Sequence, residues 1–228
     1  MMASPDMVHI SIAPSLASAP MWHLADTIAE LERAGADAIH FDLEDGHFVP
    51  VMTLGTRLIA ELRPLTRLPF DVHLMVDNPE QIVPLVASLG ADAISVHYEA
   101  CLYPRRTLRM IQGMGKRAGL AFNPKTPFPR VDYLLPYLDF VLILTTEPEM
   151  PDCPYLPAVL DNVRAAAAFA KEHHPRLGIT ADGGIDADNI AEVVAAGADT
   201  IVSGRAVFAG GEITANLRRL RDALRSNP

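Results

Sequence analysis

The sequence has few cysteines, few lysines and no long apolar run. Its two cysteines, Cys101 and Cys153, lie far apart without a CxxC pair, which predicts reduced thiols in a cytoplasmic protein rather than a disulfide framework. Three lysines and a formal net charge of -9 leave no basic surface for nucleic acid or anionic lipid. No stretch approaches the roughly 18 apolar residues of a membrane helix, and the start shows no export signal. We therefore expect a soluble protein with a small-molecule partner, bound to neither nucleic acid nor membrane.

A turn that recurs three times is the clearest sign of internal organisation. It reads Ala-Gly-Ala-Asp-Ala-Ile at 34–39, Leu-Gly-Ala-Asp-Ala-Ile at 89–94 and Ala-Gly-Ala-Asp-Thr-Ile at 196–201. Each glycine suits the left-handed position that ends a helix, and the apolar run after it suits a strand buried on both faces. Segments of helical periodicity precede all three copies. The pattern predicts helices that alternate with parallel strands.

Eight strands are predicted, and their number suggests how the sheet is arranged. They are His9–Ala13, Ala38–Asp42, Phe70–Met75, Ala93–His97, Ala118–Phe122, Phe140–Thr145, Gly178–Asp182 and Thr200–Ser203. About eight strand-helix units in some 230 residues is the count at which a parallel sheet closes into a barrel. We expect residues 1–228 to form a single (β/α)8 barrel domain, also called a TIM barrel. A doubly wound open sheet is the alternative.

Four metal-binding side chains stand where these strands are expected to end. His40 and Asp42 are two residues apart on one strand and therefore point to the same face. His73 lies between two apolar residues on the next strand, and Asp182 directly precedes a Gly-Gly turn. If the strands are parallel neighbours, all four side chains converge at the end of the barrel that carries active sites.

Motifs along nearly the whole chain resemble the ribulose-phosphate 3-epimerase family. They run in order as IAPSLAS, HFDLEDGHFVP, FDVHLMVDNPE, ISVHYEA, FNPKTP, ADGGI and SGRAVF. The resemblance implies a (β/α)8 barrel, a divalent metal ion and epimerisation next to the ketone of a sugar phosphate, by default D-ribulose 5-phosphate to D-xylulose 5-phosphate. It carries the four metal ligands over to His40, Asp42, His73 and Asp182.

The chemistry of that reaction explains these residue types. A proton next to a ketone is about 20 kcal/mol harder to remove than that of a carboxylic acid, so a carboxylate needs help from a Lewis acid that stabilises the enediolate. Inversion also requires acid/base groups on both faces of the carbon, a role that fits Asp42 and Asp182. Two imidazoles and two carboxylates suit Zn, Fe, Mn or Co rather than Ca.

The resemblance also suggests a substrate-binding set and shows where this chain departs from the family. The expected substrate contacts are Ser15, Glu44, His73, Met75, Gly183, Gly184, Gly204 and Arg205. Glu44 and Leu144 replace family methionines, and Arg205 stands where a serine is usual. The segment Glu147–Pro154 is acidic and proline-rich where the family has a glycine-rich phosphate loop. Arg205 can offset that loss, because its guanidinium can hold a phosphate with two hydrogen bonds.

Three alternatives to the default reaction stay open. The altered loop and Glu44 favour an epimerase of the same family that acts on a different or non-phosphorylated sugar. A decarboxylase or aldolase on a related barrel is less favoured, because Lys116, Lys125 and Lys171 do not lie inside predicted strands. The last is a binding protein that has kept the metal pocket without turnover. We expect His97 and Glu99 to support the ligands or line the substrate site, and the resemblance implies a homo-oligomer.

Overall fold

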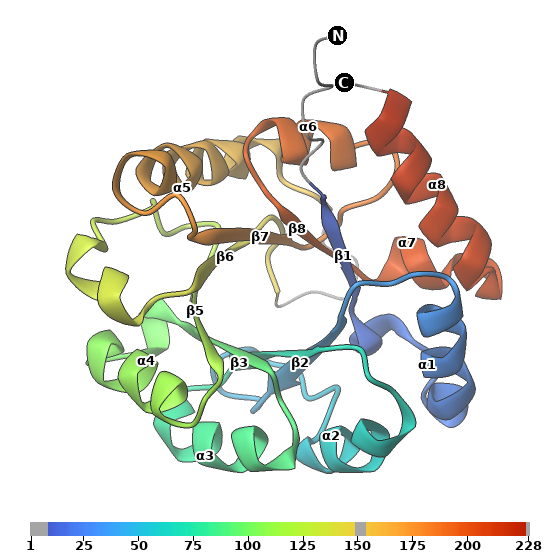
Figure 1. Cartoon of the computed structure of the whole chain (residues 1–228), viewed down its shortest axis with the longest axis horizontal. Helices are drawn as coiled ribbons and strands as arrows, with labels where there is room; N and C mark the ends of the chain where they lie inside the picture. The colour runs from blue at the N-terminus through green and yellow to red at the C-terminus, as the bar shows by residue number, and fades with distance from the viewer. Residues whose placement is uncertain (1–8, 149–153, 227–228) are drawn as a thin grey trace, which may run out of the picture.

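Eight parallel strands surround the centre of the molecule and the helices cover the strands from outside (Figure 1). The computed structural model describes residues 9–148 and 154–226. The strands are β1 Ser11–Pro14, β2 Ile39–Glu44, β3 Phe70–Met75, β4 Ala93–His97, β5 Arg117–Phe122, β6 Phe140–Leu144, β7 Gly178–Asp182 and β8 Thr200–Ser203. The α-helices are α1 Leu24–Arg33, α2 Thr56–Leu62, α3 Pro79–Leu89, α4 Pro104–Gly113, α5 Leu160–His173, α6 Ile190–Ala195, α7 Arg205–Phe208 and α8 Ile213–Ser226.

The strands form a nearly closed barrel. Parallel pairing runs without interruption from β2 through β8 and on to β1. Across the remaining seam, Ser15 and His40 form a parallel bridge, and the Asp37 N–H donates to the Ile12 carbonyl at 3.0 Å. These contacts join the first strand to the second. The predicted (β/α)8 barrel is confirmed, and the open-sheet alternative is wrong.

The predicted strands agree with the observed ones to within two residues at each end. β3, β4, β7 and β8 have the predicted bounds, whereas β2 continues two residues further, to Glu44. Between β5 and β6 the described chain has a 3-10 helix, Asp132–Tyr137, in place of an α-helix. Pro136 lies inside this helix and removes a backbone donor, which favours the shorter element.

Alternation along each strand separates the apolar core from the polar interior of the barrel. On β2, Ile39 and Phe41 are fully buried under the helices, and the Phe41 ring packs 4.8 Å from that of Phe70 on β3. Burial of each such side chain stabilises the fold by about 2–3 kcal/mol. His40 and Asp42 point the other way, so the same alternation that builds the core places polar groups inside the barrel.

The recurring turn closes the amino-terminal end of the barrel with aspartates. The Asp37 carboxylate accepts from the Ile12 N–H at 2.7 Å. Asp92 and Asp199 do the same for residues at the start of β3 and β7, Phe70 at 2.8 Å and Ile179 at 3.0 Å. Asp139, which lies outside the three copies, accepts from the Ala118 N–H at 2.8 Å. The predicted left-handed glycines are confirmed, with φ of 81° at position 35 and 115° at positions 90 and 197. Each even strand is thus preceded by an aspartate whose carboxylate binds the start of the preceding odd strand.

The expectations of no membrane helix and of reduced cysteines can be compared with the described residues. Among them, no helix is long and apolar enough to cross a membrane. Cys101 is a free thiol, and burial raises its pKa to about 11, which makes it a poor nucleophile. Cys153 lies outside the described residues.

Candidate active site

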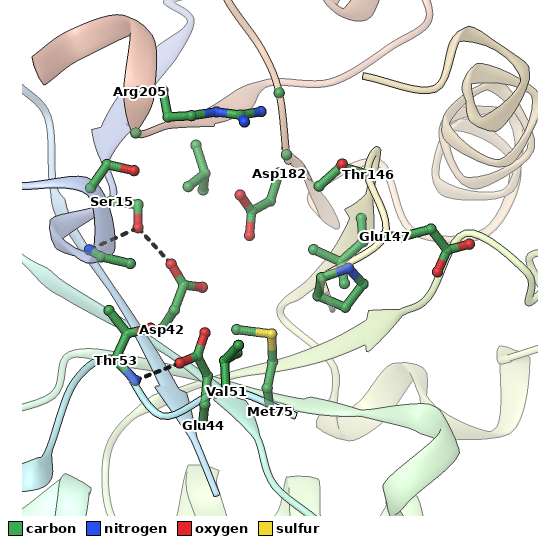
Figure 2. A pocket seen from close by; sticks show the side chains of 18 residues that line it. Ser15, Asp42, Glu44, Val51, Thr53, Met75, Thr146, Glu147, Asp182 and Arg205 are labelled. Carbon is green, nitrogen blue, oxygen red and sulfur yellow. Dashed lines mark hydrogen bonds between the residues drawn. The ribbon is translucent and has the colours of Figure 1, made fainter. Parts of the chain in front are cut away.

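A cavity of about 340 Å³ opens at the carboxyl ends of the strands (Figure 2). Eighteen residues line it: Ser15, Ala17, Ser18, Asp42, Glu44, Val51, Thr53, Met75, Leu144, Thr146, Glu147, Pro148, Asp182, Gly183, Gly184, Val202, Gly204 and Arg205. Every residue predicted to contact substrate is among them except His73, which is fully buried. The other seven predicted contact residues therefore border one cavity.

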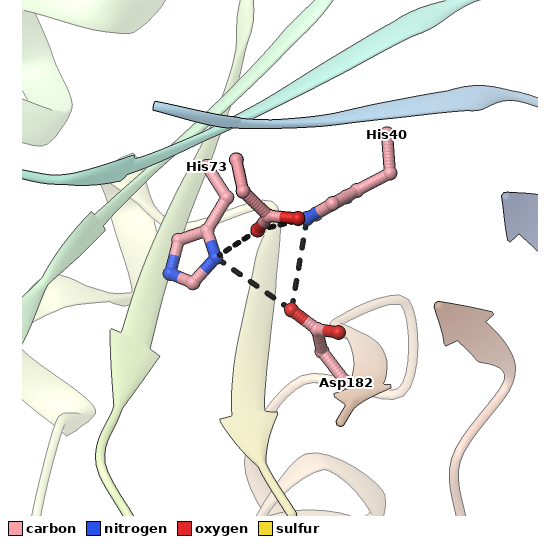
Figure 3. A group of neighbouring side chains, drawn as sticks. His40, His73 and Asp182 are labelled. Atoms are coloured by element: carbon pink, nitrogen blue, oxygen red, sulfur yellow. Dashed lines mark hydrogen bonds and ion pairs between the residues drawn. The ribbon is translucent and has the colours of Figure 1, made fainter. Parts of the chain in front are cut away.

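The four predicted metal ligands form one buried cluster at the base of this cavity (Figure 3). Each offers a ligand atom, and these atoms all lie within 4.8 Å of one another. Asp42 Oδ1 is 3.2 Å from both His40 Nε2 and His73 Nδ1. Asp182 Oδ2 reaches the same two nitrogens at 3.7 and 3.6 Å. Ligands that each stand about 2.0–2.2 Å from a metal lie about 3–4 Å apart, so the cluster can hold a metal ion.

Strand register explains why these side chains meet. His40 lies beside Asp71, Asp42 beside His73 and Glu44 beside Met75 in the β2–β3 pair. Side chains of paired residues on one face are neighbours, so two adjacent strands present three polar or soft pairs into the barrel. Asp182 arrives from β7 across the interior, and its carbonyl accepts from Thr145 N at 2.7 Å, which fixes the turn after β7.

Ser15 orients one of the two carboxylates. Its hydroxyl donates to Asp42 Oδ2 at 2.5 Å, while the other carboxylate oxygen faces the two histidines. The Ser15 Oγ also accepts from Ala17 N at 3.3 Å and so caps a short 3-10 helix, Leu16–Ser18. The bridge between Ser15 and His40 holds the serine beside the cluster, so the seam of the barrel also positions a site residue.

The charges in the cluster shift the pKa values of its members. Burial alone would lower the pKa of His40, but the carboxylates of Asp42 and Asp71 raise it well above its ordinary range. The pKa of His73 is likewise raised by Asp182 and Asp42 against the effect of burial. Burial and the nearby Asp42 charge raise the pKa of Asp182, whereas the histidines hold that of Asp42 far below its usual value despite burial. The two carboxylates therefore differ in basicity.

A second set of polar residues lies behind the histidines. His40 Nδ1 is 2.9 Å from Asp71 Oδ2, and His73 Nε2 is 2.9 Å from His97 Nε2. His97 Nδ1 in turn lies 3.1 Å from Glu99 Oε2. His97 does not line the cavity, so of the two roles expected for it the structure favours support of a ligand. Asp71 was not predicted, although its place two residues before His73 puts both side chains on one face of the strand.

Glu44 lines the cavity beside Met75 and has a backbone partner. Its Oε2 accepts from the Thr53 N–H at 2.7 Å, and burial raises its pKa. Thr53 lies nine residues further along the chain, so a loop residue supplies this hydrogen bond. In Figure 2, Glu44 and Arg205 lie on opposite sides of the cavity with Asp42 and Asp182 between them. The cavity therefore has a carboxylate at one end and a guanidinium at the other.

Three glycines and Arg205 form the other end of the cavity. Gly183 and Gly184 have positive φ values of 119° and 66°, which favour residues without a Cβ. A Cβ on Gly184 would lie 2.8 Å from the Tyr155 backbone nitrogen, so glycine lets the chain after β6 approach the turn after β7. Gly204 and Arg205 follow β8 on the same wall. The backbone is thus exposed to the cavity at this end.

The glycine-free segment after β6 borders the cavity through Glu147 and Pro148. Figure 2 shows the Glu147 carboxylate directed away from Asp42 and Asp182. Thr146 Oγ1 donates to the Pro154 carbonyl at 2.9 Å and ties the two described ends of the segment together. Residues 149–153 of the segment lie outside the described residues.

Fold and site together define a (β/α)8 barrel with a buried cluster of two histidines and two aspartates at the carboxyl ends of its strands. Residues 11–208 match the sequence model of the ribulose-phosphate 3 epimerase family. The chain belongs to this family, whose named members are epimerases, a class of isomerase.

Named relatives agree with the family assignment, and a solved structure agrees with the fold. The chain is 41% identical to "Ribulose-phosphate 3-epimerase 1" of Cupriavidus necator, over 94% of this chain and 92% of the relative. It is 39% identical to the ribulose-phosphate 3-epimerase of Bacillus subtilis, over 87% and 92%. A 3-keto-L-gulonate-6-phosphate decarboxylase structure from Vibrio cholerae superposes with a TM-score of 0.69 at 12% identity, over 97% of this chain and all of that one. This last likeness shows the shared barrel fold.

Proposed function

We propose that the protein is a metal-dependent epimerase that interconverts D-ribulose 5-phosphate and D-xylulose 5-phosphate. The observation that carries the proposal is the placement of two carboxylates, Asp42 on β2 and Asp182 on β7, beside the same pair of imidazoles and on the lining of one cavity. Family membership and relatives of about 40% identity that bear the name ribulose-phosphate 3-epimerase support it.

The donor set fits a divalent metal ion. His40 Nε2, His73 Nδ1, Asp42 Oδ1 and Asp182 Oδ2 would hold it. Mixed nitrogen and oxygen ligands suit Zn, Fe, Mn or Co, whereas Ca favours oxygen ligands alone. Such an ion supplies a Lewis acid that stabilises negative charge on the ketone and hydroxyl oxygens of the substrate.

The two aspartates would move the proton at C3. One carboxylate takes this proton from one face of the carbon, and the other returns a proton to the opposite face, which inverts the configuration. The hydroxyl of Ser15 holds Asp42 Oδ2 at 2.5 Å and so fixes the direction in which that carboxylate points.

The polarity of the cavity supports an orientation for the substrate. Backbone groups at Gly183, Gly184 and Gly204, together with Arg205, would bind the phosphate. Glu44 and Met75 would then contact the opposite end of the sugar, where the Glu44 carboxylate can accept a hydrogen bond from a substrate hydroxyl.

Proton NMR in D2O tests the proposal most simply. Metal-loaded protein mixed with D-ribulose 5-phosphate should incorporate deuterium at C3 and produce D-xylulose 5-phosphate. Addition of a chelator should stop both processes, and restoring the metal should recover them. Absence of exchange in protein whose metal content has been verified would contradict the proposed substrate.

A second candidate is the same chemistry on a different or non-phosphorylated sugar. It is favoured by Glu44 inside the cavity and Glu147 at its edge, both of which raise the negative charge near the site. Values of kcat/KM for D-ribulose 5-phosphate and for non-phosphorylated ketoses decide between the two. A preference for the pentose phosphate of more than about 100-fold, equivalent to about 2.7 kcal/mol, would remove this candidate.

The other expectations concern an aldolase, a binding protein without turnover, and the assembly and location of the protein. None of the three lysines lines the cavity, which argues against a Schiff-base aldolase. The NMR experiment also separates an enzyme from a binding protein that has kept only the metal pocket. A homo-oligomer in the cytoplasm remains our prediction, and sedimentation together with fractionation of cells would test it.

A further inference from the structure

The two histidines of the cluster face it with different nitrogens. His40 directs Nε2 toward Asp42 and Asp182, whereas His73 directs Nδ1 toward the same carboxylates. Each ring must keep its facing nitrogen free of hydrogen to bind a metal, so its hydrogen has to lie on the other nitrogen. The two rings therefore need opposite tautomers in one cluster.

His40 has a direct partner that fixes its tautomer. The Asp71 carboxylate can only accept, and its Oδ2 lies 2.9 Å from His40 Nδ1. The hydrogen of His40 is therefore drawn to Nδ1, away from the cluster. His73 has no carboxylate at its rear nitrogen; His97 Nε2 lies there instead, at 2.9 Å.

A series of hydrogen-bonded side chains behind His73 ends at a carboxylate. His97 is fully buried, with its ring stacked 4.9 Å from the His73 ring and tilted against the Phe48 ring at 4.5 Å. Its Nδ1 is 3.1 Å from Glu99 Oε2. The other oxygen of Glu99 accepts from the Asn123 N–H at 2.9 Å and from the Thr126 hydroxyl. Glu99 is thus held in place by the segment that follows β5.

Each contact in this series of hydrogen bonds holds one hydrogen. The acceptor at the end of the series decides which nitrogen of each ring carries it. The Glu99 carboxylate accepts, so the hydrogen of a neutral His97 lies on Nδ1 and its Nε2 can only accept. His73 Nε2 must then be the donor in the contact between the two rings. This leaves His73 Nδ1 without hydrogen and directed into the cluster.

We propose that Glu99, acting through His97, is a positioning residue that holds His73 in the tautomer required of a metal ligand. Neither residue lines the cavity, so neither contacts the substrate. The inference rests on the metal site of the proposed function. It extends that site from four side chains to a hydrogen-bonded chain that ends at the loop after β5.

Glu99→Gln tests the chain with a minimal change in shape. The glutamine oxygen is drawn toward the Asn123 N–H, which can only donate, so the amide NH2 turns toward His97 Nδ1. His97 must then accept at Nδ1 and carry its hydrogen on Nε2, where it donates to His73 Nε2. The hydrogen of His73 moves to Nδ1, the nitrogen that faces the cluster.

The measurement is Zn²⁺ affinity by competition with a chromogenic chelator. We expect E99Q to bind Zn²⁺ about 10- to 100-fold more weakly than the wild type. Glu80→Gln is the matched control, because Glu80 is also a partly buried carboxylate that accepts a hydrogen bond, from Thr107 at 2.9 Å, but lies on α3. E80Q should bind Zn²⁺ within about twofold of the wild type, and thermal unfolding should show that both variants are folded.

Substitution of His97 provides an independent arm. His97→Phe keeps a ring between His73 and Phe48 but offers no acceptor, so it should weaken Zn²⁺ binding as E99Q does. His97→Gln can place an amide oxygen near the former Nε2 position and should recover part of the affinity. Nitrogen-15 NMR of the Zn²⁺-loaded wild type should show the His73 hydrogen on Nε2.

The outcomes separate this inference from the proposed function. Wild-type protein that binds neither Zn²⁺ nor Mn²⁺ would overturn the metal site and the positioning role together. If the wild type binds while E99Q and H97F both match E80Q in affinity, the positioning role is overturned and the metal site stands. A His73 hydrogen found on Nδ1 in the Zn²⁺-loaded wild type would also overturn it.

Discussion

The two ends of the barrel carry the same side chain, aspartate, in different surroundings. At the amino end, Asp37, Asp92, Asp139 and Asp199 each accept a hydrogen bond from a backbone N–H of the preceding strand. At the carboxyl end, Asp42 and Asp182 face imidazoles and a cavity. A backbone N–H always remains a hydrogen-bond donor to its carboxylate. A carboxylate that faces an imidazole and a cavity can instead bind a metal ion or take a proton from a substrate. The partner of each carboxylate therefore indicates its role.

The amino-end contacts are reciprocal, which suits a structural role. Asp139 N donates to the Ala118 carbonyl at 2.9 Å while its side chain accepts from the Ala118 N–H at 2.8 Å. The same two-way contact joins Asp92 to Phe70 and Asp199 to Ile179. Both backbone groups of the strand residue are satisfied by the aspartate, so the contact holds neighbouring strands in register.

The largest expected effect follows from neutralising an aspartate at the carboxyl end. Asp182→Asn and Asp42→Asn should each lower kcat on D-ribulose 5-phosphate by about 10³-fold or more, since each removes an acid/base group and a metal ligand. A coupled assay for D-xylulose 5-phosphate measures this. If either variant kept more than a tenth of wild-type activity, the catalytic role assigned to the carboxyl-end aspartates would be contradicted.

Removal of the Ser15 hydroxyl should have a smaller effect on the same reaction. Ser15→Ala loses the hydrogen bond to Asp42 Oδ2, a bond to a charged group that contributes about 1.5–3 kcal/mol. We expect kcat to fall about tenfold, equivalent to about 1.4 kcal/mol, and the thermal midpoint to fall by a few degrees. A variant with unchanged kcat would show that Asp42 keeps its orientation without the serine.

At the amino end, Asp139→Ala should change stability and leave catalysis alone. It removes the acceptor of the Ala118 N–H and of Gln112 Nε2, so the free energy of unfolding should fall by about 1–2 kcal/mol. Urea unfolding measures the loss, and kcat of the folded variant should stay within about twofold of the wild type. A tenfold loss of kcat at full stability would contradict a purely structural role.

The smallest expected effect is a change in how stability depends on pH. Burial favours the neutral form of Asp37, but hydrogen bonds from Ile12 N, Arg221 and His9 outweigh it and lower the pKa. A carboxyl with a lower pKa in the folded state stabilises the protein above its unfolded pKa, near 4, and loses this effect as pH falls through the folded value. Asp37→Asn should therefore lower the thermal midpoint at pH 7 and converge with the wild type in stronger acid. An equal difference at all pH values would contradict this assignment.

Local patterns were enough to predict most of the fold. The apolar runs and the glycine turns fixed the strands to within two residues, because both signals depend on neighbours in sequence. They did not predict the 3-10 helix before β6, and they did not reveal why Asp37, Asp92 and Asp199 recur. That reason depends on pairing between strands, which no single segment contains.

The candidate site also has a part that the sequence predicts and a part that it does not. His40, Asp42, His73 and Asp182 could be placed together, because strand ends of a parallel barrel converge. The contact of His40 with Asp71 and that of His73 with His97 required the register and the side-chain rotamers. The partner of Glu44 is a loop residue whose position no periodic pattern encodes.

Deuterium exchange started from each epimer separately tests the central claim, that Asp42 and Asp182 serve opposite faces of one carbon. Metal-loaded D42N and D182N are each incubated in D2O with D-ribulose 5-phosphate and, in parallel, with D-xylulose 5-phosphate. We predict that each variant exchanges the C3 proton of one epimer only, and that the two variants favour opposite epimers. Exchange of the same epimer by both variants, or of both epimers by either, would contradict it.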